Sequence, residues 1–81
     1  MIVNVRMFAL AKQAAGAAEV QIELPAGTTV AGLRKSLQTH YPPLAELGER
    51  LLFSLDAEYA SDDDEVNEQH DIACIPPVSG G

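Results

Sequence analysis

The sequence predicts an α+β domain in which a mixed β-sheet packs against one main helix. Two segments near the amino terminus, residues 2–8 and 20–24, alternate apolar and polar side chains as half-buried strands do. A single apolar stripe of helical spacing follows at residues 30–41, and the segment at residues 71–75 contains a short apolar run. Because strand segments precede and follow the one long helix in the sequence, we expect them to form a sheet with the helix packed on one of its faces.

The amino-terminal residues predict two strands joined through a short helix. Residues 9–15 are rich in alanine and stop at Gly16, which suits a helix with a glycine C-cap. Residues 20–24 form the second strand, which Pro25 closes. We expect the two strands to pair as an antiparallel hairpin. The first strand turns one set of alternate side chains to the core, namely Val3, Val5 and Met7.

The main helix has a start signal, an apolar stripe and a stop signal. Thr29 can accept a hydrogen bond as its N-cap. Pro42 and Pro43 end the helix because neither can continue its hydrogen bonding, and residues 44–48 can add one more helical turn. The stripe that faces the sheet consists of Val30, Leu33, Leu37 and Tyr41.

The carboxyl-terminal half predicts the remaining strands. Residues 50–55 are a strand candidate with Leu52 on the side opposite Phe53, and residues 58–60 could form a very short strand. Residues 61–69 are polar and acidic, which indicates a surface turn. The apolar run at residues 71–75 suits a central strand. This order of strands around one long helix is what a β-grasp fold requires.

Size and charge exclude several classes of function. The chain has 81 residues, one cysteine and a formal net charge of −7. It is too short for a second domain, and its small core leaves little room for an enclosed substrate pocket. The negative charge argues against nucleic-acid binding and favours a basic partner surface. We expect no membrane span and no signal peptide, and therefore a reducing, cytoplasmic setting.

The last six residues, Pro-Pro-Val-Ser-Gly-Gly, form the most informative motif. Gly80 and Gly81 lack a Cβ atom and can thread a channel too narrow for any other residue. Pro76 and Pro77 fix φ and favour an extended, outward-pointing stalk. We therefore expect a domain at residues 1–75 and a flexible tail at residues 76–81 that presents a carboxylate to another protein. A frayed terminus is the plain alternative.

This hexapeptide, together with Met-Phe-Ala-Leu-Ala at residues 7–11 and Leu-Pro-Ala-Gly-Thr-Thr-Val at residues 24–30, resembles one family. It is similar to the small, sulfur-carrier subunits of molybdopterin synthase (MoaD), which belong with ThiS among the ubiquitin-like sulfur carriers. The resemblance implies a β-grasp fold. Two turns depart from the family pattern: Asp56-Ala57 stands in place of an Asn-Gly-like turn, and Gln69-His70-Asp71 in place of Asp-Gly-Asp.

The resemblance also implies a chemistry for Gly81. An adenylyltransferase related to ubiquitin-activating enzymes would join AMP from ATP to its carboxylate, and a sulfur donor protein would convert the adenylate to a thiocarboxylate. The tail would then enter the large synthase subunit and give its sulfur to cyclic pyranopterin monophosphate, in a heterotetramer of two small and two large subunits. The residues that would thread the active site are Pro76, Pro77, Val78, Ser79 and Gly80.

The chain has no phosphate-binding loop, so we expect it to bind no cofactor itself and to be non-catalytic alone. Three other functions stay open. The chain could carry sulfur for thiamine, cysteine or tRNA thiolation, or it could be a ubiquitin-like modifier joined to lysines. It could also be a plain interaction domain with an incidental tail.

A partner-binding patch is predicted at Phe8, Tyr59 and Ile75. Alternation places Phe8 on the polar face of its strand, and Tyr59 and Ile75 match exposed apolar positions of the family's docking face. The alternative is that Phe8 turns into the core where its strand ends, and that Ile75 is a core residue.

The remaining polar candidates have plainer interpretations. Cys74 is expected to be a small buried hydrophobic residue rather than a reactive thiol. His40, in the last helical turn, and His70 are far apart in sequence, which argues against a metal site. Residues 62–65 are acidic but lack calcium-binding spacing, so they predict a solvated turn, with docking to a basic partner as the alternative.

Overall fold

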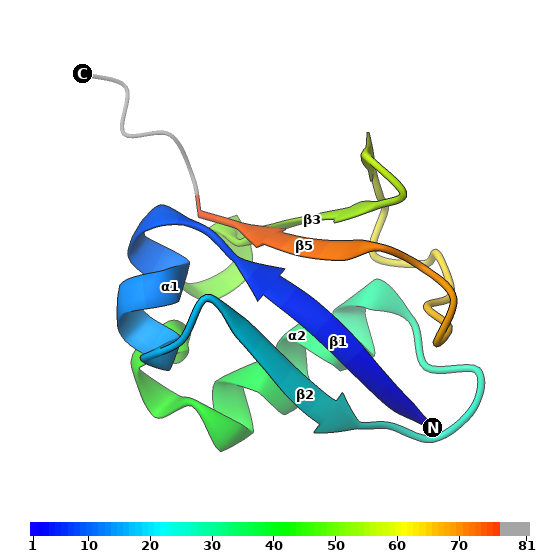
Figure 1. The fold of residues 1–81 in the computed structure, drawn as a ribbon, viewed down its shortest axis with the longest axis horizontal. Helices are drawn as coiled ribbons and strands as arrows, with labels where there is room; N and C mark the ends of the chain where they lie inside the picture. Colours follow the sequence, from blue (N-terminus) through cyan, green and yellow to red (C-terminus); the bar gives the residue numbers. More distant parts are fainter. Residues whose placement is uncertain (77–81) are drawn as a thin grey trace.

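Five strands form one mixed sheet in the computed structural model, which describes residues 1–76 except for the side chain of Glu49 (Figure 1). The sheet order is β2-β1-β5-β3-β4. The elements in chain order are β1 (Ile2–Met7), α1 (Ala9–Ala15), β2 (Glu19–Glu23), α2 (Val30–His40), the 3-10 helices η1 (Pro42–Glu46) and η2 (Gly48–Arg50), β3 (Leu52–Leu55), β4 (Glu58–Tyr59) and β5 (Ile72–Ile75).

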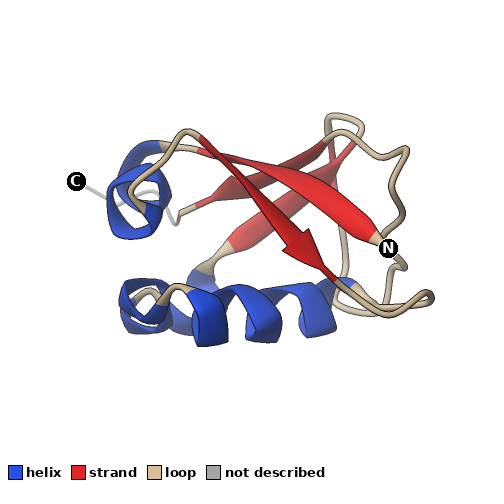
Figure 2. Ribbon diagram, turned by 60° about the horizontal axis from the view of Figure 1, so that its bottom comes forward, coloured by secondary structure: helices blue, strands red, loops and turns tan. Residues whose placement is uncertain are grey.

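The pairing of the strands confirms the predicted α+β topology. β1 is antiparallel to β2 and parallel to β5, which is antiparallel to β3, and β3 forms a hairpin with β4. β5 therefore occupies the centre of the sheet, as its apolar run predicts. Helix α2 lies across one face of the sheet, which we call the inner face, and leaves the other face uncovered (Figure 2).

The core forms between the inner face and α2. The predicted inward residues of β1 are buried, and so are three of the four residues predicted for the helix stripe, whereas Tyr41 is half-buried. Burial of each large aliphatic side chain contributes about 1.5–3 kcal/mol, so this layer supplies most of the stabilisation available to a small domain. Its largest fully buried members are Phe53, Leu33, Leu37, Leu44, Leu51 and Ile72.

Both predicted helix caps are present. Gly16 has φ of 78° and donates its backbone N–H to the Lys12 carbonyl at 2.9 Å, which ends α1. The Thr29 hydroxyl accepts a hydrogen bond from the Gly32 N–H at 3.4 Å at the start of α2.

Besides one-residue shifts at the ends of the other strands, three details differ from the sequence prediction. The turn expected at residues 44–48 begins at Pro42, because proline suits the first position of a helix. β3 begins at Leu52 rather than at residue 50, since η2 occupies residues 48–50. Ser54 is only 8% exposed although alternation turns it away from the core. It lies in the sheet between Ala73 of β5 and Tyr59 of β4, which leaves little of its short side chain accessible.

The acidic segment is exposed but is more than a solvated turn. The carbonyl oxygens of Asp64 and Asp62 accept hydrogen bonds from the Val30 and Ala31 N–H groups, at 2.8 and 3.1 Å. These are donors that a helix amino terminus leaves unpaired. The backbone of the segment therefore caps α2, while its carboxylates face solvent.

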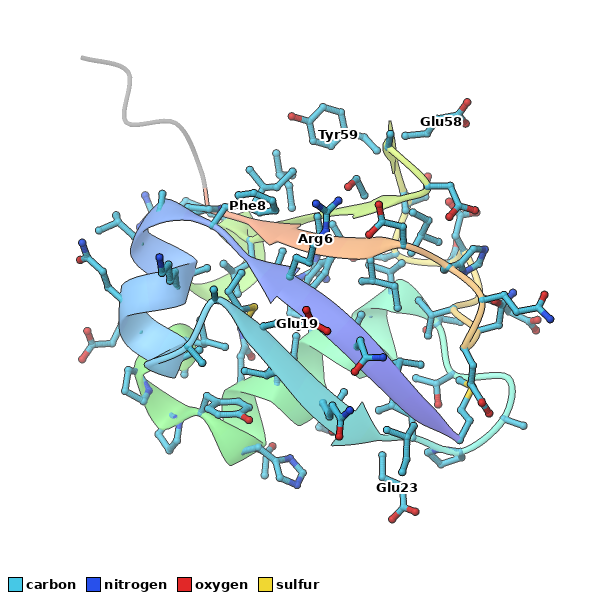
Figure 3. The ribbon with its side chains drawn as sticks, viewed as in Figure 1. Arg6, Phe8, Glu19, Glu23, Glu58 and Tyr59 are labelled. Atoms are coloured by element: carbon cyan, nitrogen blue, oxygen red, sulfur yellow. The ribbon has the colours of Figure 1, made fainter. Side chains whose placement is uncertain are left out.

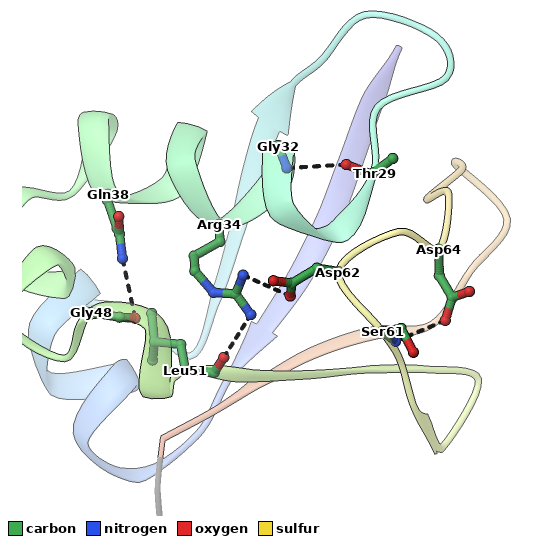
Figure 4. A network of polar contacts seen from close by, with 9 residues as sticks. All are labelled: Thr29, Gly32, Arg34, Gln38, Gly48, Leu51, Ser61, Asp62 and Asp64. Carbon is green, nitrogen blue, oxygen red and sulfur yellow. Dashed lines mark hydrogen bonds and ion pairs between the residues drawn. The ribbon is translucent and has the colours of Figure 1, made fainter.

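Arg34 of α2 joins the acidic segment to the start of β3 (Figure 4). Its guanidinium donates to the Asp62 carboxylate at 2.9 Å and to the Leu51 carbonyl at 3.1 Å. The same group lies 5.4 Å from the centroid of the Phe53 ring. The Arg34 side chain is only 12% exposed, and its hydrogen bonds link α2 to the acidic segment and to the residue before β3.

The β3–β4 turn has the left-handed geometry that an Asn-Gly pair would favour. Asp56 and Ala57 have φ values of 53° and 69°. The Asp56 carboxylate accepts a hydrogen bond from the Asp71 N–H at 2.8 Å, which ties the turn to the start of β5. The departure from the family's turn sequence therefore leaves a tight turn in place, with an alanine in a conformation that favours glycine.

Candidate functional site

Three strand ends meet where the described chain stops. β1 and β5 run parallel, so their carboxyl ends lie at the same end of the sheet, and antiparallel β3 begins there. The Phe8 N–H donates to the Cys74 carbonyl at 3.2 Å, which places Phe8 beside Ile75. We call this the root end, because residues 77–81 follow directly from it.

Apolar side chains are exposed on the outer face of the root end. Phe8 is 41% exposed, Leu52 44% and Tyr59 72%, while Ile75 is half-buried. Figure 3 labels Phe8 and Tyr59 among the side chains. Leu52 pairs with Ile75 in the register, and Tyr59 of β4 pairs with Ser54, which makes it a diagonal neighbour of Leu52 one step farther from the root end. We call these four residues the root patch. The exposure of Phe8 rules out the alternative in which it turns into the core, whereas docking by the patch stays a prediction.

The sequence prediction missed Leu52. The signal was present, because alternation set Leu52 opposite buried Leu51 and Phe53. A leucine on the solvent side of a strand is common by itself. It becomes informative only when the register places it next to Ile75.

The backbone and a neighbouring cation position Phe8. Its carbonyl accepts hydrogen bonds from the Ala11 and Lys12 N–H groups, at 2.9 and 3.3 Å, and so anchors α1. The Arg6 guanidinium lies 5.5 Å from the centroid of the Phe8 ring and forms an ion pair with Asp71 at 2.8 Å. An open hollow of about 440 Å³ adjoins the patch; its lining includes Arg6, Phe8, Lys12 and Glu19.

The predicted tail lies almost wholly outside the described residues. Pro76 is described and is buried, so contacts of the domain extend at least one residue past β5. The division into a domain at residues 1–75 and a tail at 76–81 stays a prediction. The tail residues outside the description are Pro77, Val78, Ser79, Gly80 and Gly81.

Cys74 is a core residue, as predicted. Its side chain is fully buried on the inner face of β5. Burial raises the pKa of the Cys74 thiol from 9.0 to about 12, and the nearby Arg34 charge offsets only part of this effect. The thiol is therefore protonated at neutral pH and is a poor nucleophile.

The histidines do not form a metal site. His40 contacts the Ser36 carbonyl through Nδ1 at 2.9 Å, and the His70 ring accepts a hydrogen bond from the Asn67 N–H at 3.2 Å. Within residues 1–76, no group of three or more histidine, cysteine or acidic residues could hold a metal ion. Nor does this part of the chain contain a helix with the length and apolar character to cross a membrane.

Comparison with known proteins shows the family of this chain and the names of similar proteins. The family model described as "ThiS family" matches residues 5–81. A Caenorhabditis briggsae protein named molybdopterin synthase sulfur carrier subunit is 37% identical over 81 residues, covering 98% of this chain and 96% of its own length. An Arabidopsis thaliana protein of the same name is 30% identical over 79 residues, covering 98% of this chain and 82% of its own.

Solved structures share the fold. SAMP1 from Haloferax volcanii has a TM-score of 0.84 at 21% identity, with all of both chains covered. A Pyrococcus furiosus structure, described as a candidate molybdopterin converting factor subunit 1, has a TM-score of 0.84 at 27% identity over 96% of this chain and 99% of its own. In a Helicobacter pylori complex of subunits 1 and 2 of molybdopterin-converting factor, the matching chain has a TM-score of 0.67 at 23% identity, with both chains fully covered.

The predicted β-grasp fold is thus confirmed by structures that cover 96–100% of this chain. The family match extends from β1 through the terminal glycines, so it includes both the root patch and the tail. With a family model over residues 5–81 and a 37% identical relative of nearly equal length, this chain belongs to the ThiS family of sulfur-carrier proteins.

Proposed function

We propose that this chain is the sulfur-carrier subunit of a molybdopterin synthase and acts through Gly81. The observation that carries the proposal is its near full-length similarity to relatives with that name. The geometry adds support, because an exposed apolar patch lies beside the residue from which the tail departs. Residues 1–76 supply a docking surface and a rigid base, and the reacting group lies at the end of the tail.

Activation of Gly81 needs a second protein. A carboxylate is a poor electrophile, and an adenylyltransferase would make it reactive by forming a mixed anhydride with AMP and releasing pyrophosphate from ATP. A sulfur donor protein would then displace AMP and leave a thiocarboxylate. This chain would need no cofactor of its own, since ATP is used by the activating enzyme.

The thiocarboxylate would deliver sulfur inside a larger subunit. The narrow tip of Gly80 and Gly81 gives clearance, and the stalk at residues 76–79 spans the distance from the domain surface. The thiocarboxylate sulfur would bond to cyclic pyranopterin monophosphate, and water would then hydrolyse the bond between sulfur and the Gly81 carbonyl, which leaves sulfur on the pterin and restores the carboxylate for another cycle. Five residues after Pro76 reach at most about 18 Å, which limits how deep the acceptor site can lie.

The root patch would bind the large subunit and hold the tail in register with its channel. Its aromatic and aliphatic members suit the centre of a protein interface, and the Arg6–Asp71 pair suits the polar rim. The functional unit would be a cytoplasmic heterotetramer of two small and two large subunits. The partner's surface should be basic around an apolar centre, because this chain carries a net charge of −7.

Intact-mass spectrometry tests the proposal. The protein is incubated with an adenylyltransferase of this family, ATP and a sulfide source, and its mass and fragment ions are measured. We expect a gain equal to the replacement of one oxygen by sulfur, located at Gly81. No gain, under conditions in which a known carrier reacts, would contradict the proposal.

A matched pair of variants separates the carrier role from the other open functions. Deletion of Gly81 should abolish sulfur loading and leave the thermal midpoint unchanged, because the core cluster of the described residues runs from Val3 to Cys74. Ala26→Gly, at an exposed loop position, serves as the control and should load normally. Lysine-linked conjugates in cells without a thiocarboxylate pool would favour the modifier role instead.

A further inference from the structure

β2 is an open edge of the sheet. It pairs only with β1, while the opposite edge is the two-residue strand β4. Strand edges carry unpaired backbone donors and acceptors that can template another strand. Within residues 1–76, β2 is therefore the longer of the two exposed edges of this sheet, and it lies on the side away from β3 and β4.

The register of β1 with β2 fixes which backbone groups face outward. The Met7 N–H donates to the Ala18 carbonyl at 2.7 Å, and the Leu24 N–H donates to the Met1 carbonyl at 2.8 Å. Hydrogen-bonded and non-hydrogen-bonded pairs alternate in an antiparallel ladder, so the β2 residues bonded to β1 are Val20 and Ile22. The residues between them turn their N–H and C=O groups to the open edge, namely Glu19, Gln21 and Glu23.

The same three residues give this edge its charge. Their side chains are exposed on the outer face. The backbone positions of Glu19 and Glu23 are about 13 Å apart along the strand. Figure 3 shows these two side chains at opposite ends of β2. Neither carboxylate is in an ion pair within the described part of the chain. Glu19 shares its hollow with Arg6 and Lys12, which offset some of its charge. Glu23 lies at the other end of β2.

We propose that the open edge of β2 accepts an extended basic segment of a partner protein as an additional strand. The backbone of that segment would bond to the outward groups of Glu19, Gln21 and Glu23. Lysine or arginine side chains at alternate positions would face the two carboxylates across the strand pair. This surface meets the root patch at the hollow that Glu19 shares with Phe8, whereas Leu52 and Tyr59 lie on the opposite side of the sheet.

Charge selects a basic partner over a second copy of this chain. Antiparallel pairing of two β2 strands centred on Gln21 would set Glu19 of each copy opposite Glu23 of the other. Like charges directly opposite each other destabilise a strand pair. The net charge of −7 adds repulsion between copies. A segment with alternating lysine or arginine residues would instead be attracted by the two glutamates and by the net negative charge of this chain.

The test uses amide NMR titration of the intact protein with a capped peptide, Thr-Lys-Val-Lys-Val-Lys-Thr. The control peptide has the same composition in blocks, Lys-Lys-Lys-Val-Val-Thr-Thr, and so the same charge without the alternation. We expect the largest shift changes at the amides of Glu19, Gln21 and Glu23, and at least roughly fivefold weaker binding of the control. Equal binding of the two peptides would overturn the proposal, because it indicates attraction by charge alone.

Variants of β2 separate the backbone from the charge contribution. Gln21→Pro removes an outward donor but no bond to β1, a position at which an edge strand tolerates proline. It should weaken binding on the order of tenfold, whereas Gln21→Ala keeps the donor and should change it less than about twofold. Circular dichroism and the thermal midpoint show whether each variant is folded.

Charge reversal tests the proposal even if the proline variant fails to fold. Glu23→Lys should weaken binding roughly threefold to tenfold, because it replaces an attraction with a repulsion. Glu19→Lys should have a smaller effect, since Arg6 and Lys12 already offset that charge. The result that overturns the proposal is unchanged binding in both variants, or peptide-induced shifts confined to residues 62–65.

Discussion

The two ends of the sheet differ in whether their surface groups have partners within the domain. At the far end, where the 56–57 turn and the 61–71 segment lie, polar groups are paired within the domain. Backbone carbonyls cap α2, Arg34 binds Asp62, and Asp56 binds the Asp71 backbone. At the root end, by contrast, the exposed fraction of Phe8 and Leu52 has no cover within the described chain, and neither has that of Tyr59 on the neighbouring part of β4.

This difference separates stability from recognition. The far end closes the fold, so its contacts should matter for the free energy of unfolding and little for partners. The exposed area of the root end contributes little to the isolated domain and is available for a partner. A substitution at one end should therefore change one property and leave the other nearly constant.

The largest effect is expected at the root patch. Leu52→Asp places a carboxylate in an apolar surface and should weaken binding of the molybdopterin synthase large subunit by on the order of 100-fold, with a nearly unchanged free energy of unfolding. Isothermal titration calorimetry measures the affinity. Gln69→Asp adds the same charge at the far end and should bind normally. Equal losses in the two variants would contradict the separation of the two ends.

The next effect concerns stability at Arg34. Arg34→Ala removes the hydrogen bonds to Asp62 and Leu51 and the packing against Phe53. We expect a loss of about 2–3 kcal/mol in the urea-derived free energy of unfolding. Arg50→Ala, at an exposed position, is the matched control and should change it by less than about 0.5 kcal/mol. If the Arg34 variant is as stable as the control, the Arg34 contacts do not contribute to the free energy of unfolding.

The pH dependence of stability at Cys74 shows whether water reaches the core beneath the root patch. The folded-state pKa of its thiol is about 12 against an ordinary 9.0, so folding holds a proton that the unfolded chain releases. The stabilisation is complete below pH 9 and is lost as the pH rises toward 12, which costs about 1.4 kcal/mol by pH 10. Urea unfolding at pH 8 and pH 10 measures it.

Cys74→Ala is the control for that measurement. It retains every other ionisable group but lacks the thiol, so its stability should fall less between the two pH values. The same fall in both proteins would mean that the thiol is hydrated and that the core is open at the root end.

The smallest effect is expected in the far-end turn. Ala57→Gly relieves an alanine with φ of 69° and should stabilise the domain by about 0.5–1 kcal/mol, seen as a higher thermal midpoint. Ala26→Gly, at a position without positive φ, should lower the stability slightly. A destabilised Ala57→Gly variant would show that the turn is not strained.

Local patterns were enough to predict most of the fold. Alternation gave the inward residues of β1, Gly16 and Thr29 marked the ends of two helices, and the apolar run at β5 indicated its central place. Each of these signals depends on residues close in sequence. The same is true of Cys74, whose apolar neighbours suggested burial.

What the sequence did not predict depends on distant pairings. Leu52 becomes part of a surface only through its register with Ile75, and Ser54 is covered only because of its neighbours on β4 and β5. The acidic segment looks solvated by composition, yet its carbonyls cap a helix that begins more than thirty residues earlier. Such contacts require the topology to be known first.

The parallel pairing of β1 with β5 has a consequence for synthesis on the ribosome. The centre of the sheet is the last strand made, so β1, β2 and α2 have no complete sheet until residues 72–75 have left the exit tunnel. Protease sensitivity of chains stalled before residue 72 should therefore remain high and fall once β5 is exposed. A truncated chain without β5 also lacks the neighbour that holds Phe8 and Leu52 together. Incomplete products should thus be degraded as unfolded protein and should not compete for partners.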